Sequence, residues 1–109
     1  MDKPRDGVVM ACDLSALSDN ERKRYGEFAM DIGQIANRIE EVDGGYRVLF
    51  DVDDTQIIRL AEFVGYERRC CPFLSLTIEV EPEGAALWLR LTGPAGVESF
   101  LAEELGVST

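Results

Sequence analysis

Four residues of this sequence carry side chains that could bind a soft metal ion. Glu67 precedes the adjacent pair Cys70-Cys71 by three and four residues, and Cys12 lies far upstream, ahead of the first expected helix. Residues three and four positions apart share one face of a helix, so the carboxylate and at least one thiol can point the same way. Thiolates suit Cu(I), Hg(II) or Zn(II), and a carboxylate oxygen can also bind zinc. We therefore hypothesise a metal site of Cys12, Glu67, Cys70 and Cys71.

Two other interpretations of the cysteines stay open. Buried free cysteines pack as small hydrophobic residues, so Cys70 could simply fill the helix-strand corner beneath Phe73. A redox role is ambiguous, because Arg68 and Arg69 favour a thiolate whereas the helix C-terminal dipole and the acidic chain oppose it. Adjacent cysteines can join only through a strained ring, so a disulfide would more readily use Cys12.

The residue types exclude several kinds of catalytic site. The sequence has no histidine, which removes Ser-His and Cys-His nucleophile activation and any imidazole base. Neighbouring carboxylates suit solvated surface or a helix cap better than a shared acid/base pocket; they are Glu40-Glu41, Asp53-Asp54 and Glu103-Glu104. The sequence therefore identifies no catalytic residue and no cofactor-binding residue; the cofactor stays unknown, with a soft metal ion as the one candidate, and catalysis is the less favoured interpretation.

Composition indicates a small acidic domain. A chain of 109 residues with 46% hydrophobic content can bury one core without help from a metal or disulfide. We expect a loose arm over residues 1–12 and a single domain over 13–109. The net charge of −10, from 11 basic and 21 acidic residues, repels nucleic acid and anionic membranes. The odd cysteine count, the short apolar runs and a start without an apolar signal region predict a cytoplasmic protein with reduced thiols.

The first helix has a clear start and an ambiguous end. Ser18 followed three residues later by Glu21 matches a capping box, so the helix should begin near Asp19. Apolar residues at helical spacing continue beyond Gly33, but the glycine and a later Asp-Gly-Gly turn favour a break there. The segment 35–42 is therefore expected to be a strand, with a helix as the alternative.

The rest of the chain predicts an α+β fold. We expect a four-stranded, mainly antiparallel sheet and three helices in the order α-β-β-α-β-β-α. The elements after the first hairpin strand are a strand over 46–52, a helix from about Thr55 to Arg69, strands over 74–80 and 86–91, and a helix after Gly93-Pro94.

The two halves of this pattern resemble each other. The segment from Ile39 to Phe63 can be laid over Ile78 to Ala102 at a constant offset of 39 residues, which places Leu49 on Trp88. Each copy would then be a strand, a glycine turn, a strand and a helix. Similar hairpin chemistry alone could produce the same match, so the repeat stays an open interpretation.

One sheet face is expected to carry an apolar patch. Alternation assigns Leu49 and Trp88 to the face turned away from the core, and monomers usually cover or use such a patch. The first helix has only one apolar stripe to offer. We therefore expect it to cover this face in part and a two-fold homodimer to bury the remainder.

Two blocks of the sequence resemble a known family. Glu67 to Phe73, Trp88 to Val97 and a cysteine ahead of the first helix are similar to a family of small bacterial proteins with E-x-x-C-C-P-F and W-L-x-L-T-G-P-x-G motifs. The resemblance implies membership but no established activity. The favoured function is a soft-metal-ion binder or sensor, and the alternative is a catalytically silent, dimeric interaction module with structural cysteines. A thiol redox protein comes third.

Overall fold

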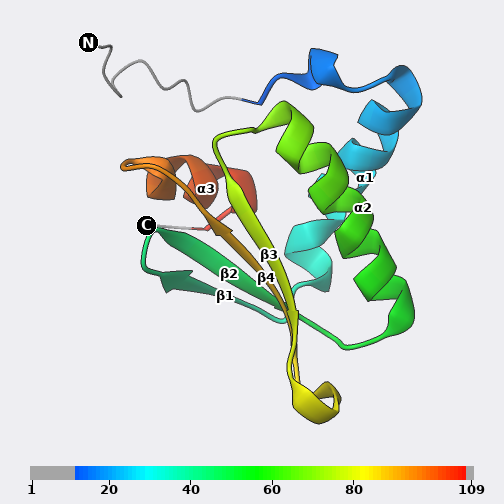
Figure 1. The fold of residues 1–109 in the computed structure, drawn as a ribbon, viewed down its shortest axis with the longest axis vertical. Helices are drawn as coiled ribbons and strands as arrows, with labels where there is room; N and C mark the ends of the chain where they lie inside the picture. Colours follow the sequence, from blue (N-terminus) through cyan, green and yellow to red (C-terminus); the bar gives the residue numbers. More distant parts are fainter. Residues whose placement is uncertain (1–11, 108–109) are drawn as a thin grey trace.

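The protein has three α-helices and a four-stranded sheet, as predicted. A computed structural model describes residues 12–107, so residues 1–11 of the expected arm lie outside the described residues. The elements are α1 (Asp19–Ile35), β1 (Arg38–Val42), β2 (Gly45–Phe50), α2 (Asp54–Cys70), β3 (Ser75–Val80), β4 (Leu87–Thr92) and α3 (Val97–Leu105), shown in Figure 1. Short 3-10 turns precede α1 (η2, Leu14–Ala16) and β4 (η3, Pro82–Gly84).

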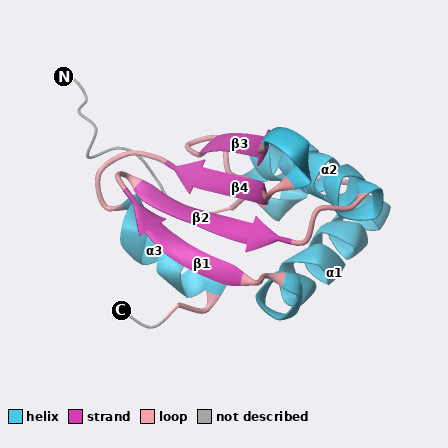
Figure 2. Cartoon of the chain, turned by 90° about the horizontal axis from the view of Figure 1, so that it is seen from below, coloured by secondary structure: helices cyan, strands magenta, loops and turns pink. Residues whose placement is uncertain are grey.

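The sheet has the order β1-β2-β4-β3, and every neighbouring pair is antiparallel. All three helices lie on one face, and no helix of the described residues covers the other (Figure 2). On the covered face, Tyr46, Val48 and Phe50 of β2 lie opposite leucines of β4, and all are buried. Within residues 12–107, no helix combines the length and the apolar character that a membrane span requires.

The start of α1 is as predicted, but its end is not. Ser18 is the N-cap, and its side chain and that of Glu21 complete the capping box. The helix then runs through Gly33 to Ile35, so the expected break near Gly33 is wrong. A mid-helix glycine costs only about 1 kcal/mol relative to alanine, and Ile32 and Ile35 on either side continue to pack on the core. The strand expected over residues 35–42 is confirmed from Arg38 to Val42, whereas Ile35 still belongs to α1.

The ββα units recur in order, but without a constant offset. β1 begins at residue 38 and β3 at residue 75, whereas β2 begins at residue 45 and β4 at residue 87. The second hairpin is longer because η3 lies in its turn, where Glu83 and Gly84 both have positive φ. The proposed alignment at 39 residues therefore does not match the elements. Leu49 and Trp88 are instead direct cross-strand partners of the β2–β4 pair.

The open face, which is the sheet face that no described helix covers, differs from expectation in two ways. The first helix does not cover it, because α1 packs on α2, with the rings of Phe28 and Phe63 stacked at 4.6 Å. Trp88 is also only 5% exposed. The Arg47 guanidinium lies 3.7 Å from the centre of its ring, and its indole N–H donates to Glu81. Neighbouring side chains thus shield the tryptophan within the chain.

Candidate metal-binding site

The buried stripe of α2 brings a carboxylate and a thiol into the core. Its four buried residues are Leu60, Phe63, Glu67 and Cys70, and this spacing of three or four residues places them on one helix face. The helix ends at Cys70, and the N–H of Cys71 still donates to the Glu67 carbonyl at 2.7 Å. Pro72 then follows, and the residue before a proline is disfavoured in the helical region.

Cys12 reaches this helix end through the segment that precedes α1. The N–H of Asp13 donates to the Cys70 carbonyl at 2.7 Å, and Leu17 at the end of the segment is buried. An Arg69 guanidinium nitrogen donates to the Ala16 carbonyl at 2.9 Å. Figure 1 shows the blue segment running past the C-terminal end of α2. Backbone and side-chain hydrogen bonds therefore hold Cys12 near the cysteine pair.

Arg69 also ties the segment to the start of α1. Its guanidinium forms a salt bridge with Glu21, with a nitrogen-oxygen distance of 3.0 Å. The same carboxylate accepts from the backbone N–H of Ser18. The hydrogen bond from Arg69, followed by that from Ser18, lowers the pKa of Glu21 to about 2. Arg69 is thus directed at Glu21 and Ala16 and serves as a structural link between α1 and α2.

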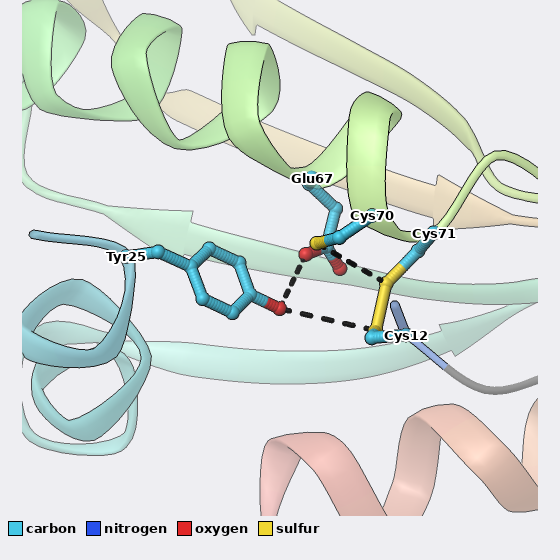
Figure 3. Close-up of a disulfide and its surroundings, with 5 residues drawn as sticks. All are labelled: Cys12, Tyr25, Glu67, Cys70 and Cys71. Atoms are coloured by element: carbon cyan, nitrogen blue, oxygen red, sulfur yellow. Dashed lines mark hydrogen bonds between the residues drawn. A yellow bond between two sulfur atoms is a disulfide. The ribbon is translucent and has the colours of Figure 1, made fainter. Parts of the chain in front are cut away.

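The three sulfur atoms meet at this junction (Figure 3). Cys12 and Cys71 form a disulfide with their Cα atoms 4.6 Å apart, and Cys70 is a free, buried cysteine. The Cys70 Sγ lies 3.9 Å from the Cys71 Sγ. The prediction that Cys12 lies within reach of the pair, and would supply the disulfide, is confirmed. The expectation of three reduced thiols differs from the structure, which has one.

Glu67 is a buried carboxyl group with one hydrogen-bond donor. It is 4% exposed, and the Tyr25 hydroxyl donates to its Oε1 at 2.6 Å. Burial raises the pKa of Glu67 to about 7; the Tyr25 hydrogen bond lowers it in part, and the nearby Glu104 carboxylate raises it. A cavity of about 30 Å³, lined in part by Tyr25, Glu67 and Glu104, lies beside this group. That volume is enough for one water molecule.

Tyr25 is the member of the site that sequence reasoning missed. It belongs to the apolar stripe of α1 and is 8% exposed, so the pattern marks it only as a core residue. Its hydroxyl lies 4.0 Å from the Cys12 Sγ as well as near Glu67. A buried tyrosine hydroxyl usually has a hydrogen-bond partner, which is the signal that could have joined it to the buried carboxylate.

The free thiol is not activated as a nucleophile. Burial raises the pKa of Cys70, and the Glu67 carboxylate raises it further. Arg69 does not stabilise a thiolate as expected, because its side chain is directed at Glu21 and Ala16. Cys70 is therefore a protonated thiol near neutral pH, and a metal ion must displace its proton in order to bind.

The four side chains form a cluster that could hold a metal ion. One ligand atom from each of Cys12, Glu67, Cys70 and Cys71 lies within 4.8 Å of the others. With metal-sulfur bonds of about 2.3 Å, two thiolates on a tetrahedral ion lie about 3.8 Å apart, and two on opposite sides of an ion about 4.6 Å apart. The Cys70–Cys71 separation of 3.9 Å matches the tetrahedral case. Cys12 and Cys71 can both become ligands only after their disulfide is reduced.

Comparison with family models, with curated proteins and with solved structures found no match to this chain. The resemblance to the family with the E-x-x-C-C-P-F motif therefore stays a prediction.

We predict that the Glu67 carboxyl makes folding stability fall as pH rises. The pKa of this group is 4.5 in its ordinary state and about 7 when buried here. Between these values the folded protein keeps a proton that the unfolded chain has lost, so higher pH favours unfolding, by up to about 3 kcal/mol. Glu67→Gln should remove this part of the pH dependence in urea unfolding of the oxidised protein.

Tyr25→Phe is the matched variant for this measurement. It removes the hydrogen bond that lowers the pKa of Glu67, so the fall in stability should extend to higher pH. Identical pH dependence in the wild type and Glu67→Gln would contradict the assignment.

Proposed function

We propose that this protein binds a soft metal ion once its Cys12–Cys71 disulfide is reduced. Cys12, Cys70 and Cys71 would supply thiolates, and Glu67 would supply an oxygen. The observation that carries the proposal is the convergence of four donor atoms within 4.8 Å, from segments as far apart as the 59 residues that separate Cys12 and Cys71. Three sulfurs and a carboxylate form a donor set typical of soft or borderline ions.

The spacing of the sulfurs favours some ions over others. The 3.9 Å between the Cys70 and Cys71 sulfurs suits a tetrahedral ion such as Zn(II), with Glu67 as the fourth ligand. Three thiolates around Cu(I) would need a similar spacing and would leave Glu67 unbound. Linear coordination of Hg(II) by two thiolates fits less well, because it needs sulfurs about 4.6 Å apart. A net charge of −10 also favours the approach of cations.

Anaerobic titration of the fully reduced protein with Zn(II), and separately with Cu(I), tests this function. We expect one ion per chain and fewer reactive thiols once the ion is bound. Cys70→Ser leaves the Cys12 and Cys71 thiols in place but removes one sulfur ligand, so it should weaken binding strongly.

Glu104→Gln is the matched control for the titration. Glu104 lines the cavity beside Glu67 but is not one of the four donors, so this variant should keep the stoichiometry of the wild type. A reduced wild-type protein that binds neither ion would refute the proposed function.

A thiol redox protein is the second candidate, favoured by a disulfide with a third sulfur only 3.9 Å from Cys71. It predicts that the protein, cycled with a dithiol reductant, reduces an exposed disulfide such as those of insulin. We expect no turnover above that of Cys12→Ser, because Cys71 is 0% exposed and the neighbouring free thiol, Cys70, is buried with a raised pKa. Turnover that depends on both Cys12 and Cys71 would favour the redox candidate.

We also propose that the chain forms a homodimer through the open sheet face. Such a dimer is equally consistent with the alternative function, a catalytically silent interaction module. The support is an uncovered face that carries partly exposed Leu49 together with charges of both signs, such as Arg90 and Glu79, from adjacent strands. Trp88 does not add to this evidence for a dimer interface, because Arg47 already shields its ring.

Sedimentation equilibrium at micromolar concentration should report twice the 12.1 kDa mass of one chain. Leu49→Arg should shift the protein to monomer, because it places a fixed charge in the middle of the buried face. A mass of one chain for the wild type would contradict the dimer and leave the metal site unaffected.

A further inference from the structure

We infer that the Cys12–Cys71 disulfide is a redox gate on the metal site: its reduction creates the site, and its oxidation expels the ion. This inference rests on the proposed function and adds its regulation. The disulfide consumes two of the three sulfur ligands, and only Cys70 and Glu67 remain as donors. One thiol and one carboxyl group cannot replace a sphere of three thiolates and an oxygen.

The two sulfurs of the disulfide differ in access. Cys71 is 0% exposed, whereas Cys12 is only partly buried. An external thiolate can therefore reach the Cys12 sulfur more readily than the Cys71 sulfur, and access is one of the factors that decide which sulfur is attacked. Attack at Cys12 expels Cys71 as a thiolate into the interior, where it lies next to Cys70. Reduction thus delivers the new thiolate directly to its place as a ligand.

The segment that carries Cys12 is held to α2 without the disulfide. The Asp13 N–H bonds the Cys70 carbonyl, and Arg69 bonds both the Ala16 carbonyl and the Glu21 carboxylate. These contacts keep Cys12 close to Cys71 after reduction, either to bind the ion or to form the disulfide again. The gate is therefore a local change at three sulfurs and leaves the helices in place.

The reduction balances with a dithiol as the reductant. One thiolate of the dithiol attacks the Cys12 sulfur, the Cys12–Cys71 bond breaks, and Cys71 leaves as a thiolate. The second thiolate of the reductant then attacks the mixed disulfide, which releases Cys12 and closes the disulfide of the reductant. Two electrons pass to the protein. The thiols lose their protons to solvent when the ion binds.

The reverse step balances with a peroxide as the oxidant. Hydrogen peroxide oxidises the Cys12 thiolate to a sulfenic acid and leaves as hydroxide, which takes up a proton to become water. The Cys71 thiolate attacks the sulfenic sulfur, forms the disulfide and expels hydroxide, which becomes a second water. The ion loses two ligands and dissociates. Cys70 stays a thiol, because a disulfide between adjacent cysteines requires a strained ring.

The test compares the two redox states of the wild-type chain. Reduced protein loaded with one Zn(II) receives one equivalent of hydrogen peroxide, while a chromogenic chelator reports free zinc and a thiol reagent counts thiols after unfolding. We expect one zinc released for every two thiols lost, with one thiol remaining. A dithiol reductant, once removed, should restore full binding.

The other outcomes of this test distinguish a failure of the redox gate from a failure of the proposed function. Equal zinc affinity in the reduced and oxidised wild type would overturn the gate and leave the proposed function intact. Zinc that stays bound while two thiols are lost would do the same. A reduced protein that binds neither zinc nor Cu(I), yet forms the disulfide with peroxide, would show that the proposed function itself fails.

Cys12→Ser gives an independent check that does not depend on the disulfide for folding. It should bind zinc more weakly through Cys70, Cys71 and Glu67, and one equivalent of peroxide should not produce an intramolecular disulfide. Far-ultraviolet circular dichroism verifies that the variant is folded. If this variant forms a Cys70–Cys71 disulfide and releases zinc as fast as the wild type, Cys12 is not the gate.

Discussion

The structure depends on how α2 buries its inner face. The stripe that buries Leu60 and Phe63 in the core continues to Glu67 and Cys70, so the packing that builds the core also carries a carboxyl group into it. A buried carboxylate is costly unless it is paired or neutralised. The Tyr25 hydroxyl supplies one hydrogen bond, which requires α1 to lie alongside α2. The position of α1 thus affects the buried carboxyl group of α2.

Local rules predicted the order of the elements and most of their ends, but not the end of α1 at Ile35. A capping box, two glycine turns and the proline after Cys71 mark element ends, and strict alternation identifies the strands. Helical spacing places Glu67 and Cys70 on one face, because the two residues lie three positions apart in the same helix. No local rule predicts that Cys12 joins them. The prediction is correct because the segment before α1 crosses the end of α2.

Contacts between distant segments were not predictable in this way. The bond from Arg69 to the Ala16 carbonyl spans 53 residues, and nothing in the sequence separates this arginine from Arg68. Tyr25 was hidden for a similar reason, since an aromatic residue in a helical stripe looks apolar. The open face shows the same limit: alternation placed Trp88 correctly, but could not show that Arg47 of the neighbouring strand would cover its ring.

The buried carboxyl group separates the functional interpretation of the cysteines from the structural one. Cys70 and Cys71 alone are explained by packing, because both are 0% exposed and small sulfur side chains fill cores well. Packing does not explain Glu67, since an apolar side chain at this place would avoid the cost of desolvation. Three sulfurs lie within 4.8 Å of its carboxylate, and the nearby Glu104 carboxylate raises its pKa. A metal cation bound beside Glu67 would turn this cost into attraction, which is the physical reason behind the proposed function.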